Sequence, residues 1–84
     1  MTWFEAEQIA EYIHNLEFSL DEWKLTNVQM RQKILELDRY NSKLSIACSN
    51  CKKHLENPQF CQLVDDLLER IDSCSRNIKE RLMA

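Results

Sequence analysis

The sequence predicts an all-α protein whose simplest architecture is an antiparallel three-helix bundle. Core-type positions recur with a 4-3-4-3 spacing from Ile9 to Leu55, which places one apolar stripe along a helix. The chain has no glycine and one proline, although sheets and loop-built active sites need the tight turns that these residues supply. We therefore expect one helical domain over residues 1–84, with few and short connections.

Polar residues interrupt this stripe at two positions only, Asn27 and Asn41. The stripe consists of Ile9, Ile13, Leu16, Leu20, Trp23, Asn27, Met30, Ile34, Leu37, Asn41, Leu44, Cys48, Cys51 and Leu55. Asparagine at a core position of packed helices sets register and partner number rather than adding stability. We therefore take Asn27 and Asn41 as candidate residues for contact with a partner helix.

A helix boundary is predicted near residue 57. Asn57 is a favourable N-cap and Pro58 suits the first helical position, where its missing N–H has no partner to lose. Pro58 also disfavours helical geometry at Asn57, so the preceding helix should end near residue 55 or 56. The segment after this boundary has its own apolar stripe, formed by Phe60, Val64, Leu67, Ile71, Cys74 and Ile78.

The first 55 residues allow two arrangements. A break near residues 24–28, with Thr26 and Gln29 forming a capping box, gives three helices of similar length. Ser19 and Glu22 form an equally good box earlier in the chain. Alternatively, a long helical hairpin, about 2–55 and 58–83, dimerises as an antiparallel coiled coil with a first helix of roughly 75 Å. The apolar face is wider than a two-stranded seam, which favours the bundle. The residues that widen it are Tyr12, Leu25, Val28, Leu35, Tyr40, Ile46 and Ala47.

Charge is unevenly distributed along the chain. Residues 1–23 carry six acidic residues and no lysine or arginine, whereas residues 24–54 carry seven basic and two acidic residues. We expect these two segments to lie antiparallel and attract each other. No aromatic residues interleave with the basic ones as stacking platforms, and the net charge of the chain is −3, so no nucleic-acid partner is expected.

Several classes of function are disfavoured by the sequence. Without glycine there is no phosphate-binding loop, dinucleotide fingerprint or nucleophile elbow. His14 has no cysteine, aspartate or serine placed to complete a catalytic set, so we expect no enzymatic activity. No apolar run approaches the roughly 20 residues that span a membrane, and no signal peptide is visible. We expect an intracellular protein, cytoplasmic or nuclear.

The four cysteines are interpreted mainly as buried thiols. Cys48, Cys51 and Cys74 fall on the apolar stripes, where reduced cysteine acts as a small hydrophobic residue, so no metal or cofactor is expected. An alternative uses the turn near residue 56. In this alternative, a zinc site would be formed by Cys48, Cys51, His54 and Cys61, or a redox disulfide would join Cys51 to Cys61.

Aromatic residues suggest how the chain could bind a partner. Trp23 falls on the stripe and is expected in the core. Trp3 and Phe4 either plug the end of the bundle or form an exposed anchor for a partner. We therefore predict a non-enzymatic helical protein–protein interaction module. It would scaffold or regulate a larger assembly through an exposed helix face or by self-association; the alternative is the zinc- or redox-responsive hairpin.

Overall fold

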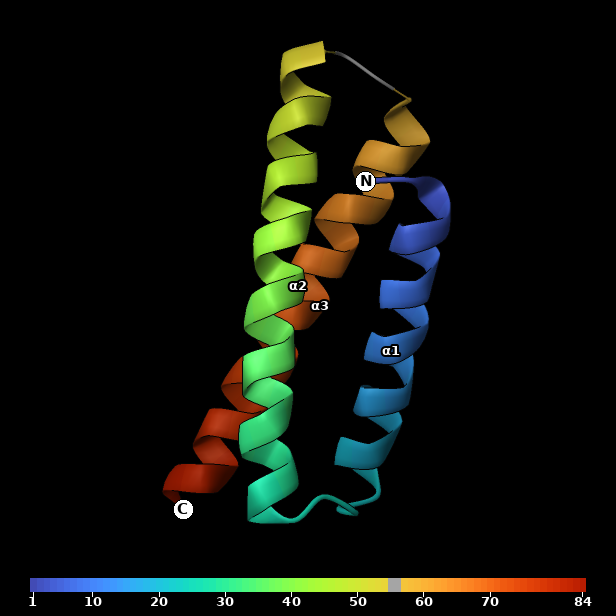
Figure 1. Cartoon of the computed structure of the whole chain (residues 1–84). Helices are drawn as coiled ribbons and strands as arrows, with labels where there is room; N and C mark the ends of the chain where they lie inside the picture. The colour runs from blue at the N-terminus through green and yellow to red at the C-terminus, as the bar shows by residue number, and fades with distance from the viewer. Residues whose placement is uncertain (55–56) are drawn as a thin grey trace.

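The computed structural model describes the backbone of residues 1–54 and 57–84 and the side chains of residues 1–51 and 57–84. Three helices follow one another along the chain: α1 (Trp3–Asp21), α2 (Asn27–His54) and α3 (Pro58–Met83). They run alternately down, up and down a bundle 42 Å long (Figure 1). The prediction of an all-α, antiparallel three-helix bundle is confirmed.

The chain breaks between α1 and α2, so the alternative of one long first helix is wrong. Trp23 has a backbone φ of 54°, in the left-handed region. The N–H of Trp23 donates to the carbonyl of Leu20 at 3.2 Å, and that of Lys24 donates to the carbonyl of Ser19 at 3.1 Å. These two bonds form a Schellman motif, which ends a helix at a left-handed residue and is usually built on glycine. This chain has no glycine, so a tryptophan occupies the position.

Each helix begins with a side-chain cap. The N–H of Gln29 donates to Thr26 Oγ1 at 3.2 Å and the N–H of Thr26 donates to Gln29 Oε1 at 3.0 Å, which is the predicted capping box. Ser19 lies inside the last turn of α1, so the competing box with Glu22 does not start a helix. The predicted cap at Asn57 is also confirmed, because its side chain accepts a hydrogen bond from the N–H of Gln59 at 3.0 Å.

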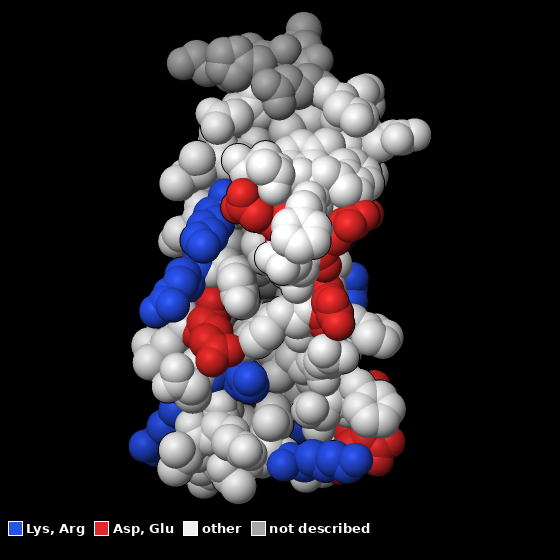
Figure 2. All heavy atoms as spheres, turned by 45° about the vertical axis from the view of Figure 1, so that its right-hand side comes forward, with Lys and Arg blue, Asp and Glu red and all other residues white. Residues whose placement is uncertain are grey.

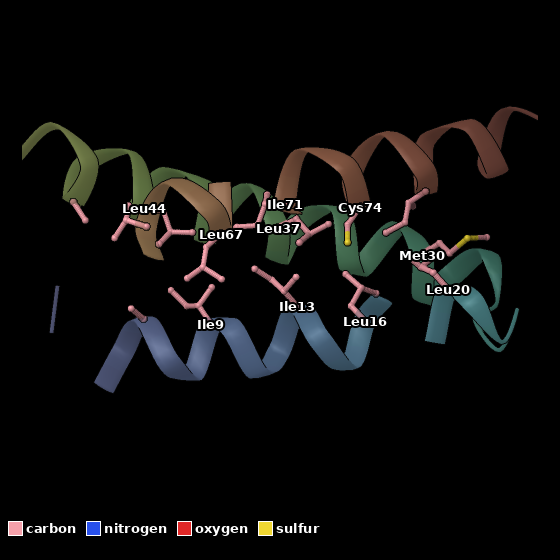
Figure 3. Close-up of a cluster of buried hydrophobic side chains, with 14 residues drawn as sticks. Ile9, Ile13, Leu16, Leu20, Met30, Leu37, Leu44, Leu67, Ile71 and Cys74 are labelled. Carbon is pink, nitrogen blue, oxygen red and sulfur yellow. The ribbon is translucent and has the colours of Figure 1, made fainter. Parts of the chain in front are cut away.

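The core lies where the buried faces of all three helices meet, and Figure 3 shows these side chains pointing toward one another. Both predicted stripes supply it. The buried members of the two stripes are Ile9, Ile13, Leu16, Leu20, Met30, Leu37, Leu44, Cys51, Val64, Leu67, Ile71, Cys74 and Ile78. Helix α3 contacts both α1 and α2 more extensively than these two helices contact each other.

Three predicted stripe positions lie at the surface. Trp23 is 75% exposed, because it lies in the loop, and Asn27 is exposed as the first residue of α2. Asn41 is also exposed. Helix α2 is rotated so that the opposite edge of the stripe faces the core, and on that edge Tyr40 is half-buried and Ala47 is buried. Both asparagines therefore lie outside the core of this bundle, and their contact with a partner helix stays a prediction. Leu55, the last stripe position, lies outside the described residues.

Helices α1 and α2 lie antiparallel, as predicted, but ion pairs between them do not supply the predicted attraction in the described part of the chain. Among the described residues, no ion pair joins an acid of α1 to a base of α2; Glu17 pairs instead with Arg70 of α3, at 2.5 Å. Helices α1 and α2 are linked by the Tyr12 hydroxyl, which donates to the Glu36 carboxylate. Burial and this bond raise the pKa of Tyr12, and the bond lowers the pKa of Glu36, so it is intact at neutral pH.

Two leucines on α2 test the bundle directly. Leu37 is fully buried and Leu35 is 63% exposed, although they are only two positions apart. We expect Leu37→Ala to lower the free energy of unfolding by about 2–5 kcal/mol, because it leaves a cavity in the core. Leu35→Ala should change it by no more than about 0.5 kcal/mol. Urea denaturation followed by circular dichroism measures both, and equal losses would contradict the orientation of α2.

The left-handed residue provides a second test, of the loop. Trp23→Gly and Trp23→Ala both remove the indole ring, so their difference in stability reports only on the backbone. Alanine in the left-handed region is disfavoured relative to glycine by about 1 kcal/mol. We therefore expect Trp23→Gly to unfold at a higher urea concentration than Trp23→Ala. Identical midpoints would show that residue 23 does not adopt a left-handed conformation.

Candidate protein interaction surface

Helix α2 carries a second apolar stripe on its outer side. Val28, Leu35 and Ile46 are 77%, 63% and 65% exposed and together are called the outer α2 stripe below. They are separated by seven and eleven positions, close to two and three helical turns, so they lie on one line. Val28 and Ile46 are each nine positions from the buried Leu37. Nine positions make two and a half turns, which places the stripe directly opposite the core.

Basic side chains flank the outer α2 stripe. Arg31, Arg39 and Lys43 are all exposed. None of the three forms an ion pair or a hydrogen bond through its side chain within the described part of the chain. The exposed acid on α2, Asp38, lies on the same flank of the stripe as Arg31, but it forms no ion pair with any of the three bases. The outer side of α2 therefore combines aligned apolar groups with an excess of positive charge, three bases against one acid.

The outer side of α1 has the opposite charge. Phe4 and Phe18 are 66% and 57% exposed and lie fourteen positions apart on the side facing away from the core. Glu7 and Glu11 lie between them and are exposed; these four residues are called the outer α1 face below. Figure 2 shows several acidic side chains on the side that comes forward and basic side chains at the upper left edge, with further basic side chains lower in the same view. The outer α1 face thus carries negative charge, whereas the outer side of α2 carries mainly positive charge.

The predicted aromatic pair at the start of α1 is divided between two environments. The Trp3 ring packs against Phe60 of α3, with ring centroids 5.8 Å apart, and its indole N–H donates to Glu7 at 2.5 Å. Phe4 points away from this contact and is exposed. Trp3 therefore covers the end of the α1–α3 seam, whereas Phe4 is available to a partner.

The two asparagines that the sequence singled out do not belong to the outer α2 stripe. Asn27 begins α2, and Asn41 lies six positions from Leu35, about a third of a turn away from the stripe. In the sequence, Val28, Leu35 and Ile46 stand out only as residues that widen the apolar face. Their spacing could have placed them. Val28 and Ile46 lie nine positions from Leu37, and Leu35 lies nine positions from Leu44, and residues nine positions apart lie on opposite sides of a helix.

A groove of about 430 Å³ lies between α1 and α3, and one of its walls contains the thiol of Cys74. His14, Glu17 and Asp21 line it from α1, and Asn77 lines it from α3. Burial, followed by the charge of Glu17, raises the pKa of the Cys74 thiol to about 11. The thiol is therefore protonated at neutral pH, as in a buried apolar residue and unlike an activated nucleophile.

Alkylation of Cys74 tests this conclusion. Because the thiolate is the reactive form, the rate of reaction with iodoacetamide should rise about tenfold for each pH unit until the pH reaches about 11. Mass spectrometry of proteolytic peptides after timed alkylation of the folded protein measures Cys74 separately from the other cysteines. A rate that reaches its plateau near pH 8 would contradict the raised pKa.

The proposed zinc ligands are only partly described. The Cys48 thiol lies 3.1 Å from Oδ1 of Asp65 and donates a hydrogen bond to it. Cys51 is buried and Cys61 is half-buried, whereas the side chain of His54 lies outside the described residues. Within the described residues, no three histidine, cysteine, aspartate or glutamate side chains come close enough together to hold a metal ion.

None of the three helices, over the residues described, is long and apolar enough to cross a membrane. Comparison of the chain with family models, with curated proteins and with solved structures finds no match in any of the three.

Proposed function

We propose that this chain is a non-enzymatic protein–protein interaction module of the cell interior, cytoplasmic or nuclear, that docks partners through the outer α2 stripe and thereby scaffolds or regulates a larger assembly. One observation carries the proposal, namely the alignment of Val28, Leu35 and Ile46 opposite the core. Single exposed apolar residues are common on proteins. An aligned set on one side of a long helix is less common, and the step of seven positions from Val28 to Leu35 is one of the anchor spacings by which helices dock on one another.

The flanking charges indicate what kind of segment fits this surface. Arg31, Arg39 and Lys43 lack acidic partners among the described residues and lie beside the apolar line. An amphipathic helix with acidic residues around its apolar stripe would bury the apolar groups and place its carboxylates near these bases. Such charge complementarity raises association rates and excludes partners of the wrong charge.

A pair of synthetic helical peptides tests the proposal. Both carry the same leucine stripe, and the surrounding residues are glutamate in one peptide and lysine in the other. We expect the acidic peptide to shift backbone amide NMR signals of α2, with an affinity that falls as salt is raised. The basic peptide should bind at least tenfold more weakly, because its lysines oppose the bases of α2.

Leu35→Glu provides the matched variant for this titration. Leu35 is exposed and makes no contribution to the buried core, so the substitution should leave the helical circular dichroism signal unchanged while abolishing peptide binding. Glu69→Lys on α3 serves as a surface control and should bind like the unmodified protein. Shifts confined to α1 and α3, or equal affinity for both peptides, would contradict the proposal.

A further inference from the structure

The groove between α1 and α3 lies beside an ion pair that joins the same two helices. The guanidinium of Arg70 on α3 donates to both carboxylate oxygens of Glu17 on α1, from Nη2 at 2.5 Å and from Nε at 3.4 Å. A contact of this kind matches the planar fork of arginine to a carboxylate. Glu17 also lines the groove, so the pair shows which group a carboxylate at this seam binds.

One helical turn further along α1, the same arrangement lacks its base. Asp21 follows Glu17 by four positions, and α1 and α3 run in the same direction (Figure 1). Asp21 is therefore level with Cys74, which follows Arg70 by four positions. Asp21 forms no ion pair within the described part of the chain. The groove occupies the place where a second base would lie.

The thiol of Cys74 confirms that Asp21 is directed toward this groove. Burial and then the charge of Glu17 raise the pKa of the thiol to about 11, and the charge of Asp21 acts in the same direction, whereas Arg70 opposes it. A carboxylate affects a thiol in this way only when the two groups are close. Both residues line the groove, one from each helix.

The wall on α3 offers hydrogen-bond acceptors. Ser73 has a hydroxyl and Asn77 has a side-chain carbonyl, and both residues line the groove. The Cys74 side chain is 4% exposed, and its sulfur, a weak acceptor, forms no hydrogen bond with the described residues. Together with the carboxylate of Asp21, these groups suit a ligand that carries a positive charge and several N–H donors.

The apolar part of the groove suits the stem of a long side chain. Leu20 and Phe18 line it from α1. Arginine buries its methylene groups along apolar surface while its head group remains paired, and its guanidinium also stacks on aromatic rings. The base beside Phe18, Lys24, lies over the ring at 5.6 Å from the centroid and does not line the groove. The volume of about 430 Å³ is within the range of ligand pockets, about 300–1,000 Å³.

We infer that this groove binds an arginine side chain of a partner protein, whose guanidinium pairs with Asp21 as that of Arg70 pairs with Glu17. The surrounding charge favours such a partner. Residues 1–23 carry six acidic residues and no lysine or arginine, and Glu17 is the one acid among them that forms an ion pair with the described residues. Their potential attracts a basic segment. This inference goes beyond the proposed function, because it adds a second site with the opposite charge preference.

A pair of short peptides tests the inference. Both are alanine peptides with blocked ends, and the central residue is arginine in one and citrulline in the other. Citrulline has nearly the same shape as arginine but no charge. We expect the arginine peptide to shift amide NMR signals on both walls of the groove, those of Asp21 on α1 and of Ser73 and Asn77 on α3. Its affinity should fall as salt is raised. The citrulline peptide should bind at least about tenfold more weakly, because it cannot form the charged pair.

Two variants with the same change in net charge provide the control. Asp21→Asn and Glu22→Gln each remove one negative charge from neighbouring exposed positions, but only Asp21 lines the groove. Circular dichroism should show that both remain folded. Asp21→Asn should lower the affinity for the arginine peptide at least about fivefold, and Glu22→Gln by no more than about twofold. Equal losses in the two variants, equal binding of the two peptides, or no shifts at the groove would overturn the inference.

The position of the NMR shifts separates this inference from the proposed function. The acidic helical peptide should shift signals of α2, whereas the arginine peptide should shift signals of the groove. Leu35→Glu should abolish binding of the acidic helical peptide and leave binding of the arginine peptide unchanged, and Asp21→Asn should have the converse effect. A single side chain makes a smaller contact than a stripe of helix anchors. The lysine-bearing helical peptide therefore stays the weaker of the helical pair even when its bases reach the groove.

Discussion

The structure depends on the burial of one face of α3 against both other helices. Val64, Leu67 and Ile78 on this face are fully buried, and α3 is the helix that α1 and α2 share. Apolar burial is the dominant favourable term in folding, so the shared helix determines where the other two can lie. The seam between α1 and α2 is consequently less well filled and contains a polar link, from Tyr12 to Glu36, beside a hollow.

The lack of glycine has a local consequence that reaches the surface. Ending α1 with a Schellman motif requires a left-handed residue, and Trp23 takes that position. Its ring is thereby directed outward, where the guanidinium of Arg81 stacks over it at 3.9 Å from the ring centroid. A cation–π contact at an exposed site contributes about 0.5–1 kcal/mol, which partly offsets the unfavourable backbone conformation. The contact also links the loop to the last turn of α3.

Helix α2 has apolar residues on two opposite sides, which distinguishes it from α3. Leu37 and Leu44 fill the core, while Leu35 and Ile46 remain outside. In a helix that only supports a fold, the outer side is normally polar. The outer stripe and the bases beside it form a surface that the fold itself does not use. The proposed docking function uses this surface.

The sequence by itself determined the helical class, the cap at Asn57, the Thr26–Gln29 box and most of the core. The two caps depend on local chemistry. The helical class and the core follow from the spacing of apolar residues along the chain, which is the same however the helices pack. The sequence did not determine the environment of Trp23, Asn41 or Ile46. The position of Trp23 follows from the non-helical turn that ends α1, and that of Asn41 from a small rotation of α2 about its axis. Only the tertiary structure sets that rotation, since it depends on how the side chains of three helices fill one shared volume.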